Sequence, residues 1–116
     1  MDYTQRFLDY LALEKNYSSL TITSYQKDLE DFKMFYQQEE NDEQIQLARK
    51  THIRSFVMYL SQLNKSEKTI NRKLSTLRSF YKYLVKEQIL TINPIEQVHS
   101  LKRKKEVMVP FTETEI

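Results

Sequence analysis

Hydrophobic residues recur at helical spacing in four stretches of this chain. In the stretch 66–87, apolar and aromatic side chains are separated by alternating steps of four and three residues, which places them on one stripe of an α-helix. The stretches 3–15, 19–38 and 51–63 show a similar period. The stripe residues are, in chain order, Phe7, Tyr10 and Leu11; Ile22, Tyr25, Leu29, Phe32 and Tyr36; Ile53, Phe56, Val57, Leu60 and Leu63; and Ile70, Leu74, Leu77, Tyr81 and Leu84. The pattern predicts four amphipathic helices with short connections, an all-α bundle.

Polar residues mark the expected helix starts. Ser18 or Ser19 can accept a hydrogen bond from the free backbone N–H groups of the second helix, and Ser66 can do so for the fourth. We expect Thr51 to cap the third helix. Residues 39–48 show no clear period and are predicted to form a polar loop.

The composition restricts the possible chemistry. With 116 residues, the chain is one domain, or one domain with the start of another. The absence of Gly excludes a Walker loop and a dinucleotide-binding fingerprint, and it favours helices over hairpins. The absence of Cys excludes disulfides and fits a cytoplasmic location. No apolar run approaches the ~20 residues of a membrane span, and the polar start does not resemble a signal peptide.

Candidate catalytic and metal-binding side chains are sparse. His52 and His99 are the only histidines, and we expect both to be ordinary surface residues because neither has a neighbour at metal-ligand spacing. The paired acids at 39–43 lie in a polar loop, whereas an acid–base pair needs burial to separate its pKa values. We therefore predict no catalytic residue, metal, cofactor or small-molecule ligand for this chain.

Charge is distributed unevenly along the chain. Residues 1–64 hold seven Lys or Arg and ten Asp or Glu, whereas residues 65–116 hold eleven and six. From Lys68 to Lys86 there are six Lys or Arg and no Asp or Glu. A solvated helix face usually interleaves both signs, so a face of one sign predicts a polyanionic partner, most commonly nucleic acid. This basic face of the fourth helix consists of Lys68, Arg72, Ser75, Ser79, Lys82 and Lys86.

Small hydrogen-bonding side chains accompany the cations of the fourth helix, which suits contacts to phosphates and base edges. The first turns of the second helix hold a similar polar cluster, whereas its C-terminal half is acidic. A plain solvated face is the alternative interpretation. The aromatic stripe is expected to be core rather than a base-stacking platform, although Tyr25 can do both with a packed ring and a surface hydroxyl. The polar residues of the fourth helix are Thr69, Asn71, Ser75, Thr76 and Ser79; those of the second are Thr21, Thr23 and Ser24, with Lys27.

Two stretches resemble the opening of tyrosine recombinases of the phage-integrase and Xer type. The family pattern T-I/L-x-x-Y-x-x-D-L-x-x-F is matched by Thr21, Ile22, Tyr25, Asp28, Leu29 and Phe32. The pattern T-x-N/x-R-x-L-S-x-L-R-x-F-Y-x-Y-L is matched by Thr69, Asn71, Arg72, Leu74, Ser75, Leu77, Arg78, Phe80, Tyr81, Tyr83 and Leu84. Asn93-Pro94 is the usual close, and VPFTETEI resembles the start of the family's catalytic domain. The resemblance covers nearly the whole chain.

The resemblance implies a four-helix, SAM-like core-binding domain at residues 1–98. Residues 99–116 would be a basic linker and the start of a catalytic domain that the chain lacks. The domain would form half of a C-shaped clamp on double-stranded DNA, with its second and fourth helices at the major groove and phosphate backbone. Arg78 lies off the centre of the basic face and could instead support an acid in the core. The DNA contacts carried over are Thr21, Ser24, Tyr25, Lys27, Lys68, Thr69, Asn71, Arg72, Ser75 and Arg78.

The implied function of the fragment is to bind DNA without cutting it. The full protein would break and rejoin strands through a 3′-phosphotyrosyl intermediate, using catalytic residues of its second domain and further protomers assembled on the DNA. Two other functions stay open. One is a helical protein-interaction module that does not bind DNA, with its acidic 39–43 loop against a basic surface; the other is a stand-alone regulator such as an excision factor.

Overall fold

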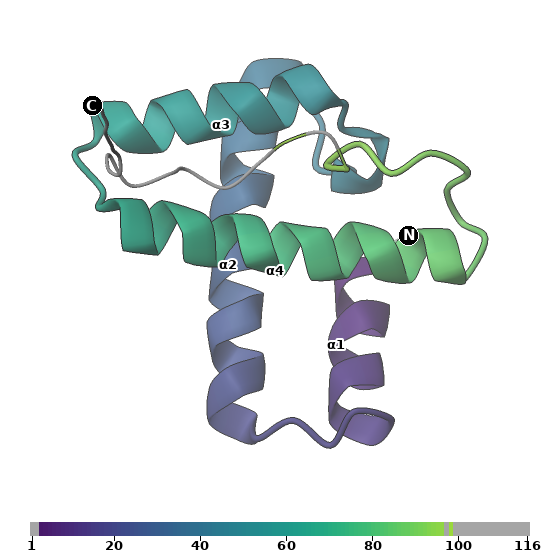
Figure 1. Cartoon of the computed structure of the whole chain (residues 1–116). Helices are drawn as coiled ribbons and strands as arrows, with labels where there is room; N and C mark the ends of the chain where they lie inside the picture. The colour runs from purple at the N-terminus through teal and green to yellow at the C-terminus, as the bar shows by residue number, and fades with distance from the viewer. Residues whose placement is uncertain (1–2, 97, 99–116) are drawn as a thin grey trace, which may run out of the picture.

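Four α-helices form the protein in the computed structural model, which describes residues 3–96 and 98 (Figure 1). They are α1 (Tyr3–Leu13), α2 (Ser19–Glu40), α3 (Lys50–Gln62) and α4 (Glu67–Lys86), and a 3₁₀ turn, η1 (Ile45–Leu47), precedes α3. The described residues contain no strand. The predicted all-α fold is confirmed, and each predicted helix begins and ends within two residues of the observed one. His99, the basic run at 102–105 and the start of the expected second domain lie outside the described residues.

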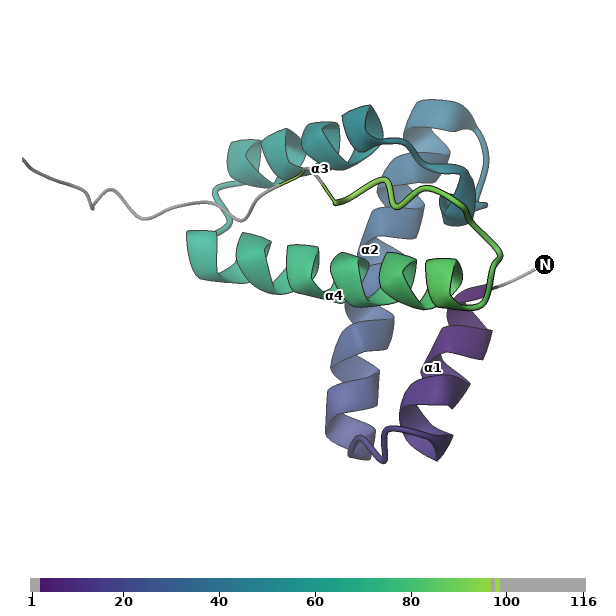
Figure 2. The ribbon, with the colours of Figure 1, turned by 45° about the vertical axis from the view of Figure 1, so that its right-hand side comes forward.

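The helices form two antiparallel pairs that cross each other (Figure 1 and Figure 2). The helices α1 and α2 lie side by side, α4 crosses both of them, and α3 lies on the C-terminal half of α2. Aromatic rings from all four helices meet at these crossings. Phe7 of α1 meets Phe80 of α4 at 5.6 Å between ring centroids, and Phe32 of α2 meets Phe56 of α3 at 5.0 Å, both edge to face. The aromatic stripe is therefore core, as predicted.

Residues other than glycine occupy the left-handed positions that follow the helices, since the chain contains no Gly. Each α-helix is followed by a residue with positive φ: Asn16 at 55°, Asn41 at 57°, Asn64 at 62° and Gln88 at 62°. Helices commonly end on a residue in this left-handed conformation, where Asn is the best substitute for Gly. The Asn41 N–H donates to the carbonyl oxygen of Gln37 at 2.7 Å, which satisfies one of the last carbonyls of α2. Asparagine thus lets a chain without Gly make short helix connections.

Residues 39–48 are not simply the polar loop that was expected. The turn η1 buries Ile45 in the core, and Ala48 follows it there. The Tyr81 hydroxyl of α4 donates to the backbone carbonyl oxygen of Ile45. Burial, with a smaller contribution from Tyr36, raises the pKa of the Tyr81 phenol well above its usual range. A single 3₁₀ turn is too short to show a hydrophobic period, so the sequence pattern missed it.

The start of α3 also differs from the prediction. Arg49, not Thr51, occupies the N-cap position. Nδ1 of His52 accepts from the Arg49 backbone N–H at 2.9 Å, and Nε2 of His52 lies 2.9 Å from Oε2 of Glu40. The expectation that His52 is an ordinary surface histidine was therefore wrong, because its ring is buried and joins α3 to the end of α2.

Candidate nucleic-acid interface

The two helices expected to face DNA begin in the same way. Ser18 Oγ accepts from the Thr21 backbone N–H at 3.2 Å and donates to Thr21 Oγ1 at 3.0 Å. Ser66 Oγ accepts from the Thr69 N–H at 3.1 Å and donates to Thr69 Oγ1 at 3.1 Å. The predicted caps Ser18 and Ser66 are confirmed. Because each threonine oxygen accepts from its capping serine, its own hydroxyl hydrogen can donate outward, for instance to a phosphate oxygen.

The basic face lies on the outward side of α4. Lys68, Arg72, Ser75, Lys82 and Lys86 are exposed and Ser79 is half-buried, while the hydrophobic stripe of α4 on the other side is buried. Within residues 3–96 and 98, the ammonium groups of Lys68 and Lys82 have no hydrogen-bond or ion-pair partner. These two positive charges are therefore available to a ligand.

A buried carboxylate ties α2 to α4 beneath this face. The Asp28 side chain is 1% exposed and accepts from Nη2 of Arg72 at 2.8 Å, Nζ of Lys73 at 3.1 Å and Oγ1 of Thr76 at 2.8 Å. Lys73, itself buried, also donates to the carboxylate of Asp31. Three donors satisfy a charge that would otherwise be costly to bury. The sequence suggested that only an external polyanion balances the cations of α4. In the structure, acids of α2 balance two of these cations, Arg72 and Lys73.

Arg72 connects this buried cluster to the surface. Its side chain is 54% exposed although Nη2 is bound to Asp28. A guanidinium has five N–H donors in a fixed plane. The Asp28 bond therefore holds the plane in one orientation while other donors face solvent, which suits binding a phosphate or a base edge.

The residues expected from α2 lie on the turns that lead up to Asp28, where α2 meets α4. Ser24 lies one turn before Asp28 on the same stripe of α2, which places it near Arg72. Ser24 and Lys27 are exposed, and Tyr25 is half-buried. The Tyr25 ring lies 6.1 Å from Phe7 between centroids, so it is packed as predicted. Ser24 and Lys27 thus lie exposed within about a turn of Asp28, where α2 meets Arg72, whereas Thr21 lies further toward the start of α2.

Two of the expected contacts lie closer to the interior. Arg78 is half-buried, and its Nη2 donates to the backbone carbonyl oxygen of Val98 at 2.9 Å. This bond joins α4 to the segment that follows Pro94. Asn71 is also half-buried.

Sequence reasoning missed the role of Asp28, which was noted only as part of a family pattern. Its position next to the hydrophobic stripe of α2 was the signal in the sequence that could have indicated a buried acid.

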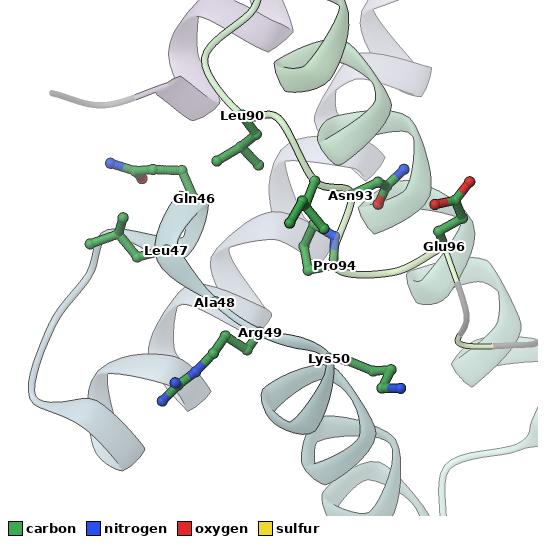
Figure 3. Close-up of a pocket in the computed structure, with 10 residues that line it drawn as sticks. Gln46, Leu47, Ala48, Arg49, Lys50, Leu90, Asn93, Pro94 and Glu96 are labelled. Carbon is green, nitrogen blue, oxygen red and sulfur yellow. The ribbon is translucent and has the colours of Figure 1, made fainter.

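A cavity of about 480 Å³ lies away from this surface, between η1, the start of α3 and the segment 90–96 (Figure 3). Leu47, Leu90 and Pro94 give it apolar walls, with Arg49 and Lys50 along one side. None of its lining residues belongs to the expected DNA contacts.

Among the described residues, no three His, Cys, Asp or Glu side chains gather to hold a metal ion, and no helix could cross a membrane.

Comparison with known protein families gives the class of this domain. Residues 4–88 match the family described as "Phage integrase, N-terminal SAM-like domain". The chain therefore belongs to the phage integrase N-terminal SAM-like domain family, and the resemblance to tyrosine recombinases, proteins that act on DNA, is confirmed.

Individual relatives are tyrosine recombinases XerC. The chain is 39% identical to the XerC of Anoxybacillus flavithermus over 105 residues, which are 90% of this chain and 34% of the relative. It is 40% identical to the XerC of Listeria innocua (86% of this chain, 33% of the relative) and 34% identical to that of Bacillus subtilis (91% and 34%). The chain thus spans about a third of the length of these curated relatives. No solved structure matches it.

Proposed function

We propose that this chain is the DNA-binding N-terminal domain of a site-specific tyrosine recombinase. The observation that carries the proposal is the exposed side of α4, where the partnerless ammonium group of Lys68 lies about one turn before the oriented guanidinium of Arg72. Phosphate contacts of this kind dominate the affinity of proteins for duplex DNA. Membership of a recombinase family supports DNA as the polyanion rather than another partner.

Two kinds of side chain, present on both helices, would divide the recognition between them. The cations would bind backbone phosphates, while the small polar side chains near the crossing of α2 and α4 would reach base edges in the major groove. The proposed phosphate contacts are Lys27, Lys68, Arg72 and Arg78. The proposed hydrogen-bonding contacts are Thr21, Ser24, Tyr25, Thr69, Asn71 and Ser75.

The wider setting follows from the same proposal. Residues 1–98 would be the core-binding domain and 99–116 the linker and first residues of a catalytic domain. The whole protein would act in the cytoplasm without a cofactor, assemble with further protomers on DNA, and break and rejoin strands through a 3′-phosphotyrosyl intermediate. This domain would supply binding and no catalytic residue.

Salt-dependent binding of a short fluorescent duplex tests the proposal. Each lost phosphate contact reduces the slope of log affinity against log salt by about 0.9. We expect Lys27→Ala/Lys68→Ala to reduce it by about 1.8, because both side chains are exposed and neither takes part in the Asp28 cluster. Arg72→Ala should lower both affinity and slope.

Lys33→Ala is the matched control, because Lys33 lies on α2 beside Thr4 and Glu43, away from α4. It should leave the slope unchanged. An unchanged slope in the double variant would contradict the proposed surface. Failure of the unaltered protein to bind the duplex at low salt would favour a protein-interaction module instead.

A further inference from the structure

The basic face of α4 ends at a corner where the C-terminal half of α4 passes the end of α1, and Lys15 adds a further positive charge there. A cavity of about 360 Å³ opens there. Its floor is aromatic, with the rings of Tyr10 and Tyr83 4.8 Å apart between centroids. Lys15, Lys82 and Lys86 line it, and no Asp or Glu does. Three positive charges thus converge on one concave surface.

Of the three lysines at this corner, only Lys86 interacts with another described side chain. The ammonium groups of Lys15 and Lys82 have no hydrogen-bond or ion-pair partner in the described part of the chain. Nζ of Lys86 lies 4.9 Å from the centroid of the Tyr10 ring and donates to the Tyr10 hydroxyl at 3.4 Å. That hydrogen bond, helped by Glu14 and Glu87, raises the pKa of Lys86, so this lysine stays protonated.

The corner continues the surface already described. Ser79 and Lys82 follow Ser75 along α4 by about one and two turns. Tyr17, on the rim, meets Tyr25 edge to face at 5.9 Å between centroids. The cavity is therefore contiguous with the proposed contacts on both α2 and α4.

We propose that this corner is a second phosphate-binding subsite for the DNA backbone, an inference that rests on the proposed function. From Lys68 to Lys86 the helix rises about 27 Å, since each residue adds about 1.5 Å. Phosphates of one strand follow each other at about 3.4 Å along the duplex axis, so a backbone following α4 reaches the corner within about eight nucleotides. Lys15 and Lys82 bind its phosphates as point charges, and the hydroxyls of Tyr17 and Ser79 donate to phosphate oxygens.

The double variant Lys15→Ala/Lys82→Ala tests the subsite in the same salt titration. We expect the slope to fall by about 1.8, one contact for each lysine. Lys15→Arg/Lys82→Arg should keep the slope because it keeps the charge. The melting temperature should not change, since both side chains are exposed and without partners. A thermal melt of each variant therefore separates lost binding from lost folding.

The outcomes separate this inference from the proposed function. If Lys27→Ala/Lys68→Ala lowers the slope and Lys15→Ala/Lys82→Ala does not, the corner lies off the DNA and the inference is overturned alone. If the unaltered protein does not bind duplex, both are overturned.

The same chemistry could recognise a free polyphosphate. Titration with tripolyphosphate, followed by amide chemical shifts, distinguishes the two sources. Saturable shifts at Lys15 and Lys82, together with an unchanged duplex slope, would overturn the assignment to DNA backbone.

Discussion

Replacing Asp28 by Ala should unfold the crossing between α2 and α4 more effectively than any change to the basic face. The Asp28 carboxylate accepts three hydrogen bonds, two of them from charged donors. Its removal leaves the Lys73 ammonium, 7% exposed, with Asp31 alone. It also leaves the buried Thr76 hydroxyl without this acceptor.

The expected loss of stability follows from this geometry. Removing one partner of a buried ion pair costs about 3–5 kcal/mol, because the other charge stays buried and poorly paired. The half-exposed Arg72 can turn to water, and Lys73 keeps its bond to Asp31, so the lower end, about 3 kcal/mol, applies here. For a helical domain of this size, each kcal/mol shifts the melting temperature by about 4–8 °C, so we expect a fall of about 12–24 °C.

Thermal unfolding followed by circular dichroism measures this loss. Asp31→Ala is the matched control: its carboxylate is 44% exposed, and Lys73 keeps Asp28. It should cost no more than about 1 kcal/mol, as expected for a partly solvated pair. A destabilisation by Asp28→Ala no larger than that of Asp31→Ala would refute the reasoning.

A triple variant separates the buried charge from the packing. Asp28→Leu with Lys73→Met and Thr76→Val should recover most of the lost stability, because apolar side chains of similar size replace buried ion pairs at little cost. It should not recover duplex affinity, since Arg72 would lack the carboxylate that orients it. Full recovery of DNA binding would show that Arg72 needs no such partner.

Two further predictions concern other buried or capping hydroxyls. The Tyr81 phenol should not ionise in the folded domain near pH 10, whereas it does so in the unfolded chain. The free energy of unfolding should therefore fall as pH rises above about 10. Tyr81→Phe should flatten that fall, and it should cost about 1 kcal/mol because the Ile45 carbonyl loses its donor. A pH series of urea melts checks both. Ser18→Ala should destabilise α2 by about 1 kcal/mol because it removes the acceptor for the Thr21 N–H, whereas Ser19→Ala, one residue on, should not; equal melts would contradict the assigned cap.

Much of the architecture could be predicted from local pattern. A helical period of 3.6 residues determines which side chains share a stripe, so four helices and the buried side of α4 followed from spacing alone. The caps Ser18 and Ser66 followed from residue type, because capping is a contact within three residues. The exposed basic face of α4 followed in turn, since it lies opposite the hydrophobic stripe.

Contacts between distant segments could not be predicted this way. Asp28 meets Arg72 and Lys73 across 44 and 45 residues, His52 turns inward to Glu40, and the corner near Lys15 exists only because α4 crosses the end of α1. The reason is geometric: spacing along one helix determines which of its residues face the same way, but not where a second helix crosses it. The position of that crossing determines whether a charged side chain of α4 forms an ion pair within the fold or stays exposed to a ligand.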